Sequence, residues 1–160
     1  MDAIVAVYED WGIGAKGDQP IALSADRKFF RTMTKGSTVI VGRRTLEAFP
    51  GGKPLPNRRN LVITGHGCST EGVEPASSCE EAARMAQGDG QVFVIGGGSV
   101  YAQMLPLCDR AYVTKVHVRP ESDAFFPDLD QSPQWVLEEI LQSGEENGIA
   151  YEMCLYRRIR

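Results

Sequence analysis

The sequence has no long apolar run, no closely paired cysteines and no surplus of basic residues. Its longest apolar stretches, such as residues 3–8 and 38–41, are as long as a strand and far shorter than the roughly 20 residues of a membrane helix. The 4 cysteines lack the spacing of a zinc or redox motif, which predicts free thiols in a reducing compartment. The amino terminus lacks the basic and apolar regions of a secretory signal, so we expect a cytoplasmic protein. The net charge of −4 makes a nucleic-acid partner unexpected, because binding to phosphate backbones needs a basic surface.

The composition is that of a globular protein, with 42% hydrophobic and 24% charged residues. No repeat, low-complexity tract or flexible linker divides the chain, so residues 1–160 are expected to form a single domain. Charge is unevenly spread along the sequence, because the segment 38–64 contains several basic residues and only one acid, Glu47. A basic segment in an acidic protein indicates a site for a small anion, although a solvated basic face would look the same.

Strand-like and helix-like segments alternate along the chain. Buried strands are expected at residues 3–8, 38–42, 60–64, 91–95 and 111–118, and helices at residues 24–34, 43–49, 78–86 and 99–105. Residues 135–143 and 149–157 are expected to form a hairpin around a loop at 144–148. This alternation predicts an α/β fold with a mostly parallel sheet, helices on both faces and an antiparallel hairpin at one edge. Ligands of such sheets bind beyond the carboxyl ends of the strands.

Asp26 is the first candidate for chemistry. In the helix expected to be capped by Ser24, it precedes Phe29, Phe30 and Met33 by three, four and seven positions, which places its carboxylate on the apolar face. A buried charge costs several kcal/mol unless it is paired, and the neighbouring sequence offers no obvious partner. A ligand with an N–C–N edge could supply two hydrogen bonds. The alternative is a structural role, because acids are favoured in the first turn of a helix.

Two strand-to-helix turns are candidates for binding phosphate. Gly96, Gly97 and Gly98 follow one strand, and glycines there let the backbone approach a phosphate. Gly42 follows another strand and leads into Arg43, Arg44 and Thr45. Arginines at a helix start are unfavourable unless an anion meets them, and two anion sites suit a dinucleotide such as NADP. A plain turn and a solvated basic face are the alternatives.

Arg58 and Arg59 follow the stiff segment 54–56, which contains two prolines. Either arginine could grip a carboxylate through two hydrogen bonds, or both could simply aid solubility. The 2 histidines show no metal-ligand or catalytic-triad spacing, and no metal site is expected.

Several segments together carry a resemblance to a known family. They are residues 13–14, 20–26, 39–45, 54–60, 94–101 and 126–128. In this order and spacing the chain resembles bacterial dihydrofolate reductases from end to end. The resemblance implies a single-domain, mostly parallel eight-stranded sheet flanked by helices. It also implies NADPH-dependent reduction of dihydrofolate to tetrahydrofolate, by hydride transfer to pterin C6 and protonation at N5, in support of one-carbon metabolism.

The resemblance also implies roles for residues around the substrate. Asp26 matches the catalytic carboxylate that binds the 2-amino and N3 edge of the pterin. Ile4 and Phe30 match contacts to the pterin and the aminobenzoyl group. Arg58 matches the arginine that holds the α-carboxylate of the glutamate tail, and Thr114 matches a threonine hydrogen-bonded to the catalytic carboxylate.

On the cofactor side, the resemblance assigns Arg43 and Thr64 to the 2′-phosphate end of NADPH and Ala6 and Ile13 to the nicotinamide pocket. The remaining implied cofactor contacts are Arg44, Thr45, Ile95, Gly96, Gly97, Gly98, Ser99, Val100 and Tyr101. Residues 9–23 match a mobile flap, with Asp123 as its partner in a second loop.

The chain departs from the family at Ile21, where bacterial members usually carry a tryptophan that helps to hold a water near the pterin. Slower turnover is the expected consequence. We also expect a monomer that binds antifolate inhibitors. The alternatives are a pyrimidine reductase of the same fold, which Asp26 and Arg58 argue against, and a module that binds NADPH or folate without turnover.

Overall fold

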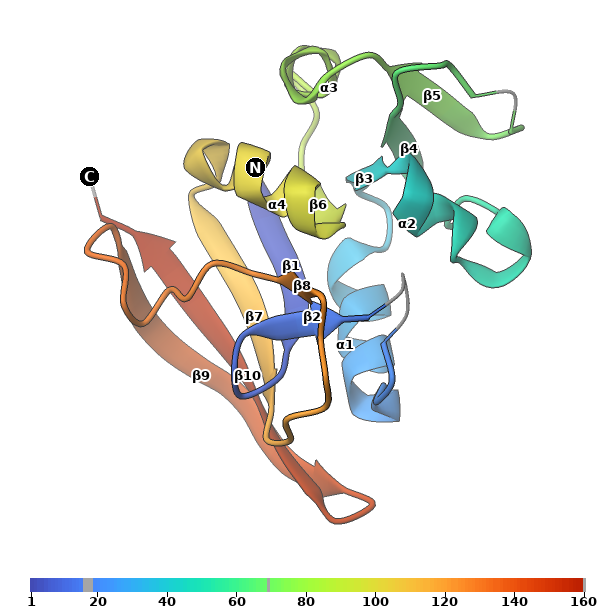
Figure 1. Ribbon diagram of the computed structural model, residues 1–160. Coiled ribbons are helices and arrows are strands. Elements are labelled where there is room, and N and C mark those ends of the chain that lie inside the picture. Colours follow the sequence, from blue (N-terminus) through green and yellow to red (C-terminus); the bar gives the residue numbers. More distant parts are fainter. Residues whose placement is uncertain (16–18, 69, 160) are drawn as a thin grey trace.

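The computed structural model describes residues 1–15, 19–68 and 70–159, which are built around one large sheet (Figure 1). The sheet contains 8 strands in the order β5-β4-β3-β6-β1-β7-β10-β9. The bounds of these strands are β1 Asp2–Val7, β3 Thr38–Gly42, β4 Arg59–Ile63, β5 Val73–Ala76, β6 Val92–Gly96, β7 Arg110–Val116, β9 Trp135–Glu146 and β10 Ile149–Arg158. Neighbouring strands are parallel except where β10 pairs with β7 and β9. The predicted fold class is therefore confirmed.

Side chains alternate between the two faces of the sheet along each strand, so buried strands present apolar side chains on both faces. Helices cover both of these faces. The helices are α1 Ser24–Thr34, α2 Arg43–Glu47, α3 Cys79–Met85 and α4 Gly98–Met104, with short 3-10 turns at Pro50–Gly52 and Leu105–Leu107. Buried residues of α3 and α4, such as Ala82 and Met104, share one core cluster with Val5 of β1. Leu46 of α2 packs with Ile4 in a second cluster on the opposite face, together with half-buried residues of α1. No helix in the described part of the chain is long and apolar enough to cross a membrane.

The strand β5 is an eighth strand, beyond the seven that the sequence pattern predicts. Its sequence, Val-Glu-Pro-Ala, does not alternate, and Pro75 has no backbone N–H to donate. Proline is tolerated here because β5 lies at the edge of the sheet and pairs only with β4. A second unexpected pairing joins β2, Gly12–Gly14, to β8, Ala124–Phe125. The strand β2 lies within the segment 9–23 predicted as a flap, of which residues 16–18 fall outside the described residues.

The C-terminal hairpin is tighter than predicted. The expected loop at 144–148 is instead strand up to Glu146, followed by a two-residue turn at Asn147 and Gly148. Both turn residues have positive φ angles, 52° and 81°, which Asn-Gly pairs adopt readily and which suit the twist of a hairpin. Glu146 therefore lies at the tip of the hairpin.

The helix α1 has the predicted bounds, but its predicted cap was wrong. Ser24 is the first helical residue rather than the cap, and the cap position is taken by Leu23, which makes no side-chain cap hydrogen bond. The first N–H groups of this helix are held by the carboxylate of Glu146 instead. A cap supplied from the far end of the chain leaves no local sequence signal.

Candidate active site

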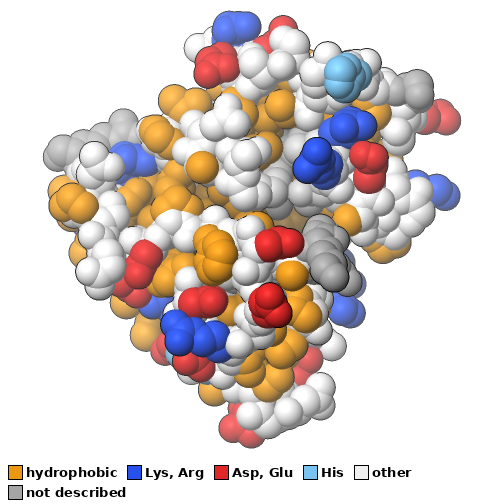
Figure 2. All heavy atoms as spheres, in the orientation of Figure 1, with side chains coloured by type: hydrophobic (Ala, Val, Ile, Leu, Met, Phe, Trp, Pro, Cys, Tyr) orange, Lys and Arg blue, Asp and Glu red, His pale blue; other side chains and the backbone are white. Residues whose placement is uncertain are grey.

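The predicted site residues gather where parallel strands end. Ala6 and Thr114 are paired near the ends of β1 and β7, and Gly96 is the last residue of β6. Figure 2 shows the face where α2, α4 and the β2–β8 ribbon meet, with basic side chains gathered on the α2 side. This is the edge at which an open α/β sheet binds its ligands.

Asp26 is half-buried near the start of α1, and Thr114 is its hydrogen-bond partner. Thr114 is only 1% exposed and lies on an interior strand of the sheet, between β1 and β10. Burial raises the pKa of Asp26, and the Thr114 hydrogen bond and the positive charge of Arg27 oppose that rise. The partner that the neighbouring sequence did not offer comes from a strand 88 positions later (114 − 26). A carboxyl group with a raised pKa in a partly buried site can hold or pass on a proton near neutral pH.

Tyr101 lies close to Asp26 on the inner side of the site. Its hydroxyl donates a 2.7 Å hydrogen bond to the carbonyl oxygen of Ile4, and both residues are buried. Burial and the negative charge of Asp26 raise the pKa of the Tyr101 phenol, which therefore stays a neutral donor. Phe30, one turn after Asp26 in α1, packs against the cluster that contains Ile4 and Ile95. The predicted substrate residues on α1 and β1 thus share one apolar wall.

The two predicted phosphate turns are in direct contact. A methyl group added to Gly97 would lie 2.8 Å from the side-chain oxygen of Thr45, and one added to Gly42 would lie 3.8 Å from the Gly96 carbonyl. β3 and β6 are neighbours in the sheet, so their following turns meet at one edge. After these turns Ser99 is exposed and Val100 is buried against Gly42. The glycines leave a cradle of bare backbone that any side chain would fill, which fits a phosphate group.

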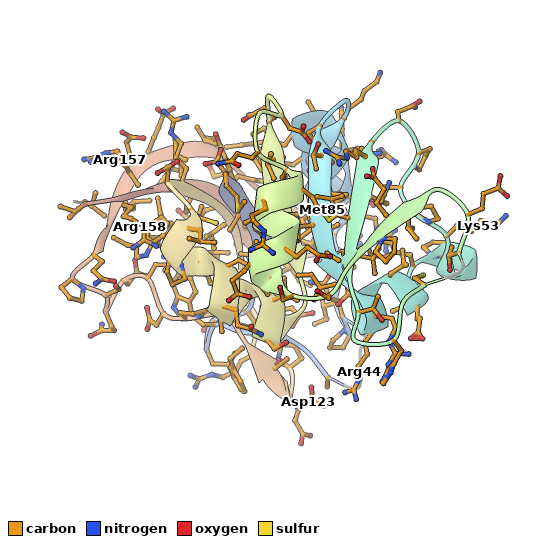
Figure 3. The ribbon with its side chains drawn as sticks, turned by 90° about the horizontal axis from the view of Figure 1, so that it is seen from above. Arg44, Lys53, Met85, Asp123, Arg157 and Arg158 are labelled. Atoms are coloured by element: carbon orange, nitrogen blue, oxygen red, sulfur yellow. The ribbon has the colours of Figure 1, made fainter. Side chains whose placement is uncertain are left out.

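The basic side chains beside this cradle face solvent. Arg43 and Arg44 are exposed, and Arg43 lies 3.7 Å from Glu47 in a weak pair along α2. Figure 3 shows Arg44 extending from α2 away from the sheet. The Thr64 hydroxyl, at the end of β4, donates to the Gly67 carbonyl at 3.2 Å and accepts from the His66 N–H at 3.3 Å. Both arginines are accessible to an anion, and Thr64 shapes the adjacent turn.

The β2–β8 ribbon closes the opposite side of the cradle. A methyl group on Gly98 would lie 3.6 Å from Ala124 and 3.9 Å from the tip of Ile13. The N–H of Asp123 donates a 2.9 Å hydrogen bond to the Gly14 carbonyl, so the predicted flap and second loop do meet. Asp123 projects from the surface in Figure 3. Ile13 is half-buried and lies beside the glycine turn, as a residue lining a cofactor pocket would.

The structure separates the roles of the two adjacent arginines. Arg59 is tied to Glu74 at 2.7 Å and to Asp89 at 2.8 Å, and these pairs raise its pKa. Arg58 instead donates to the Thr34 hydroxyl at 2.9 Å and to the Pro56 carbonyl at 2.6 Å, both neutral partners. Its positive charge is therefore oriented but not neutralised, whereas that of Arg59 is neutralised. Of these two arginines, Arg58 is the one whose charge is not already paired with an acidic side chain by a hydrogen bond.

Comparison with known proteins agrees with this geometry. The sequence profile of the family described as "Dihydrofolate reductase" matches residues 1–158. This chain belongs to the dihydrofolate reductase family. It is 37% identical to the dihydrofolate reductase of Bacillus subtilis (strain 168) over 149 residues, which are 91% of this chain and 87% of that protein. It is 36% identical to the dihydrofolate reductase of Neisseria gonorrhoeae over 96% of this chain and 94% of that protein.

A solved structure with the same fold is the dihydrofolate reductase from Enterococcus faecalis complexed with NADP(H) and RAB-propyl. The two structures match with a TM-score of 0.89 at 35% sequence identity, covering 99% of this chain and 96% of the other. The eight-stranded arrangement is thus the dihydrofolate reductase fold throughout.

Sequence reasoning missed two residues that hold the dihydrofolate reductase site together. The Tyr8 hydroxyl donates to the Ile21 carbonyl at 2.8 Å and accepts from the Ile21 N–H at 3.1 Å. Glu146 accepts from the N–H groups of Ser24 and Ala25. A tyrosine directly after a buried strand is a weak signal for the first contact. Nothing local signals the second contact, because Ser24 and Ala25 lie 122 and 121 positions from Glu146 in the sequence.

Proposed function

We propose that this protein reduces 7,8-dihydrofolate to 5,6,7,8-tetrahydrofolate with NADPH as the hydride donor. The observation that carries the proposal is the half-buried Asp26 carboxyl group, hydrogen-bonded to Thr114 and set beside the apolar wall of Ile4 and Phe30. Family membership and the NADP(H)-bound relative support the same reaction. The product would supply one-carbon metabolism.

NADPH fits the residues present at the glycine cradle. The bare backbone of Gly96 and Gly97 against Thr45 admits a pyrophosphate, and exposed Arg43 and Arg44 suit the extra 2′-phosphate. We assign Ile13 and Ala6 to the nicotinamide end of NADPH and Thr64 to its 2′-phosphate end. Residues 95–101 are assigned to contacts along the cofactor between these ends. When bound, NADPH supplies the hydride for C6 of the pterin.

On the substrate side, we assign Asp26 to the 2-amino and N3 edge of the pterin, where a carboxylate can make two hydrogen bonds. Thr114 orients that carboxyl group, and the raised pKa of Asp26 favours protonation of the substrate at N5. Ile4 and Phe30 contact the rings and exclude water. Arg58, whose positive charge has no acidic partner among its hydrogen bonds, holds the α-carboxylate of the glutamate tail.

The remaining assignments concern the whole molecule. We propose one domain over residues 1–160, since the eight-stranded sheet takes strands from both ends of the chain, including β1 and β10. We further propose a cytoplasmic monomer that is inhibited by antifolates. The 4 cysteines are free thiols, which fits a reducing compartment.

The test is to follow the loss of NADPH absorbance with dihydrofolate, beside NADH and beside Asp26→Asn. Oxidation that prefers NADPH and falls at least about 100-fold in the variant is expected, because the variant keeps the shape but loses the titrating group. Folding of the variant is checked by circular dichroism and its cofactor binding by fluorescence. Folded protein that binds NADPH but oxidises none with dihydrofolate would refute the proposal.

A further inference from the structure

The helix that carries Asp26 begins without a capping side chain of its own. The first N–H groups of any α-helix lack partners within the helix and need acceptors from elsewhere. In α1 the cap position holds Leu23, whose apolar side chain cannot accept a hydrogen bond. The start of this helix therefore depends on a group from another part of the chain.

Glu146 supplies that group from the tip of the β9–β10 hairpin. One carboxylate oxygen accepts from the Ser24 N–H at 2.8 Å, and the other accepts from the Ala25 N–H at 3.0 Å. A carboxylate at this position also meets the positive end of the helix dipole. These hydrogen bonds, one from the Ser24 hydroxyl and the charge of Arg27 lower the pKa of Glu146, so it remains ionised. Both oxygens are engaged, which fixes the direction of the first turn.

Asp26 is the next residue along that turn. Its backbone position is set by Ser24 and Ala25, and its carboxylate must meet Thr114 on the neighbouring strand. On the other side, Tyr8 holds both backbone groups of Ile21. The segment that leads into Asp26 is thus fastened before the helix by Tyr8, directly after β1, and at the helix start by the hairpin.

We propose that Glu146 is a positioning residue for Asp26: by capping the first turn of α1 from the C-terminal hairpin, it holds the Asp26 carboxyl group against Thr114. The proposal rests on the proposed function only where catalysis is the readout. Two consequences follow for a variant that lacks the carboxylate. The Asp26 carboxyl group is less well oriented for catalysis, and its hydrogen bond to Thr114 is weakened.

The second consequence has a defined sign. The groups that act on the Asp26 carboxyl group are Arg27 on its own helix, Thr114 on β7 and the neutral Tyr101 on α4. Glu146 is not among these groups. The Thr114 hydrogen bond lowers the pKa of Asp26, so weakening that hydrogen bond in a Glu146 variant should raise the pKa. A first turn that frays without moving the Asp26 side chain would lower stability and leave that pKa unchanged.

The experiment compares Glu146→Gln with Glu145→Gln, which removes the same charge from the exposed neighbouring residue. Glutamine at 146 keeps one acceptor but offers an N–H₂ group where the second acceptor was. In Glu146→Gln we expect kcat to fall about threefold to tenfold, the effect of weakening one helix cap. The Asp26-dependent limb of the pH profile, defined as the limb missing in Asp26→Asn, should move to higher pH. Glu145→Gln should match the parent protein in both respects.

A carboxyl-carbon NMR titration of Asp26 in the three proteins gives a readout that needs no turnover. A higher pKa in Glu146→Gln alone supports the proposal even if dihydrofolate proves not to be the substrate. An unmoved or lowered pKa in folded Glu146→Gln overturns it, and so does an equal shift in Glu145→Gln. Absence of NADPH oxidation by the parent protein would instead refute the proposed function, so the two failures are distinguishable.

Discussion

Substituting alanine for Gly97 should disturb the contact between the two phosphate turns. The added methyl group would lie 2.8 Å from the Thr45 side-chain oxygen, a separation that real Cβ atoms essentially never show. The φ of Gly97, −85°, is one that alanine adopts without strain. We therefore expect the contact with Thr45 to be the main source of the effect.

Overpacking of this kind destabilises a protein by about 1–3 kcal/mol. For a chain of this size that corresponds to a fall in Tm of roughly 2–4 °C for each kcal/mol. Gly98→Ala is the matched control, since its methyl group would lie 3.6 Å from Ala124, an ordinary van der Waals distance. We expect the free energy of unfolding of Gly98→Ala to lie within about 0.5–1 kcal/mol of that of the parent protein.

Urea unfolding of Gly97→Ala, Thr45→Ala and the double variant isolates the contact. Removing the Thr45 hydroxyl should restore much of the stability lost in Gly97→Ala, giving an interaction energy of about 1–3 kcal/mol between the two sites. Strict additivity of the two single effects would refute the reasoning, because it would mean that the turns do not touch. Fluorescence titration with NADPH adds a second measure, since a filled cradle should bind the cofactor more weakly.

Three further outcomes are expected. Asp26→Asn should be more stable than the parent protein at pH 7 in urea unfolding. Burial raises the pKa of Asp26 in the folded state, so the parent protein loses stability as pH rises through that pKa and the carboxyl group ionises. The advantage of the variant should therefore vanish in acid. Equal stability of the two proteins at pH 7 would contradict this reasoning. Arg58→Lys should raise KM for dihydrofolate about tenfold or more through loss of a paired hydrogen bond, whereas Arg59→Lys should lower stability and leave KM unchanged; equal effects on KM would argue against this division. Tyr8→Phe should destabilise the protein by about 1–3 kcal/mol, because the Ile21 N–H and carbonyl lose their shared partner; a thermal melt that matches the parent protein would show that the contact is dispensable.

Much of the fold and of the candidate site followed from local patterns in the sequence. The bounds of α1 and β3 agree with the predicted ones, because apolar periodicity and flanking glycines act over a few residues. The glycines at 96–98 and the Arg43–Arg44 pair indicated, for the same reason, the two turns that we propose to bind phosphate. The family resemblance added the substrate side, including Thr114 as the partner of Asp26, which no local pattern contained.

Other features depended on contacts between distant parts of the chain. Local sequence left the choice between Arg58 and Arg59 open, and we favour Arg58 because Glu74 and Asp89 pair with Arg59. The strand β5 carries a proline that argues against a strand until its edge position is known. The cap of α1 comes from Glu146, at the other end of the chain. Local sequence specifies backbone conformation and which face of an element is apolar; which charges meet, and which helix end receives an acceptor, depends on packing that brings distant residues within about 3 Å of each other.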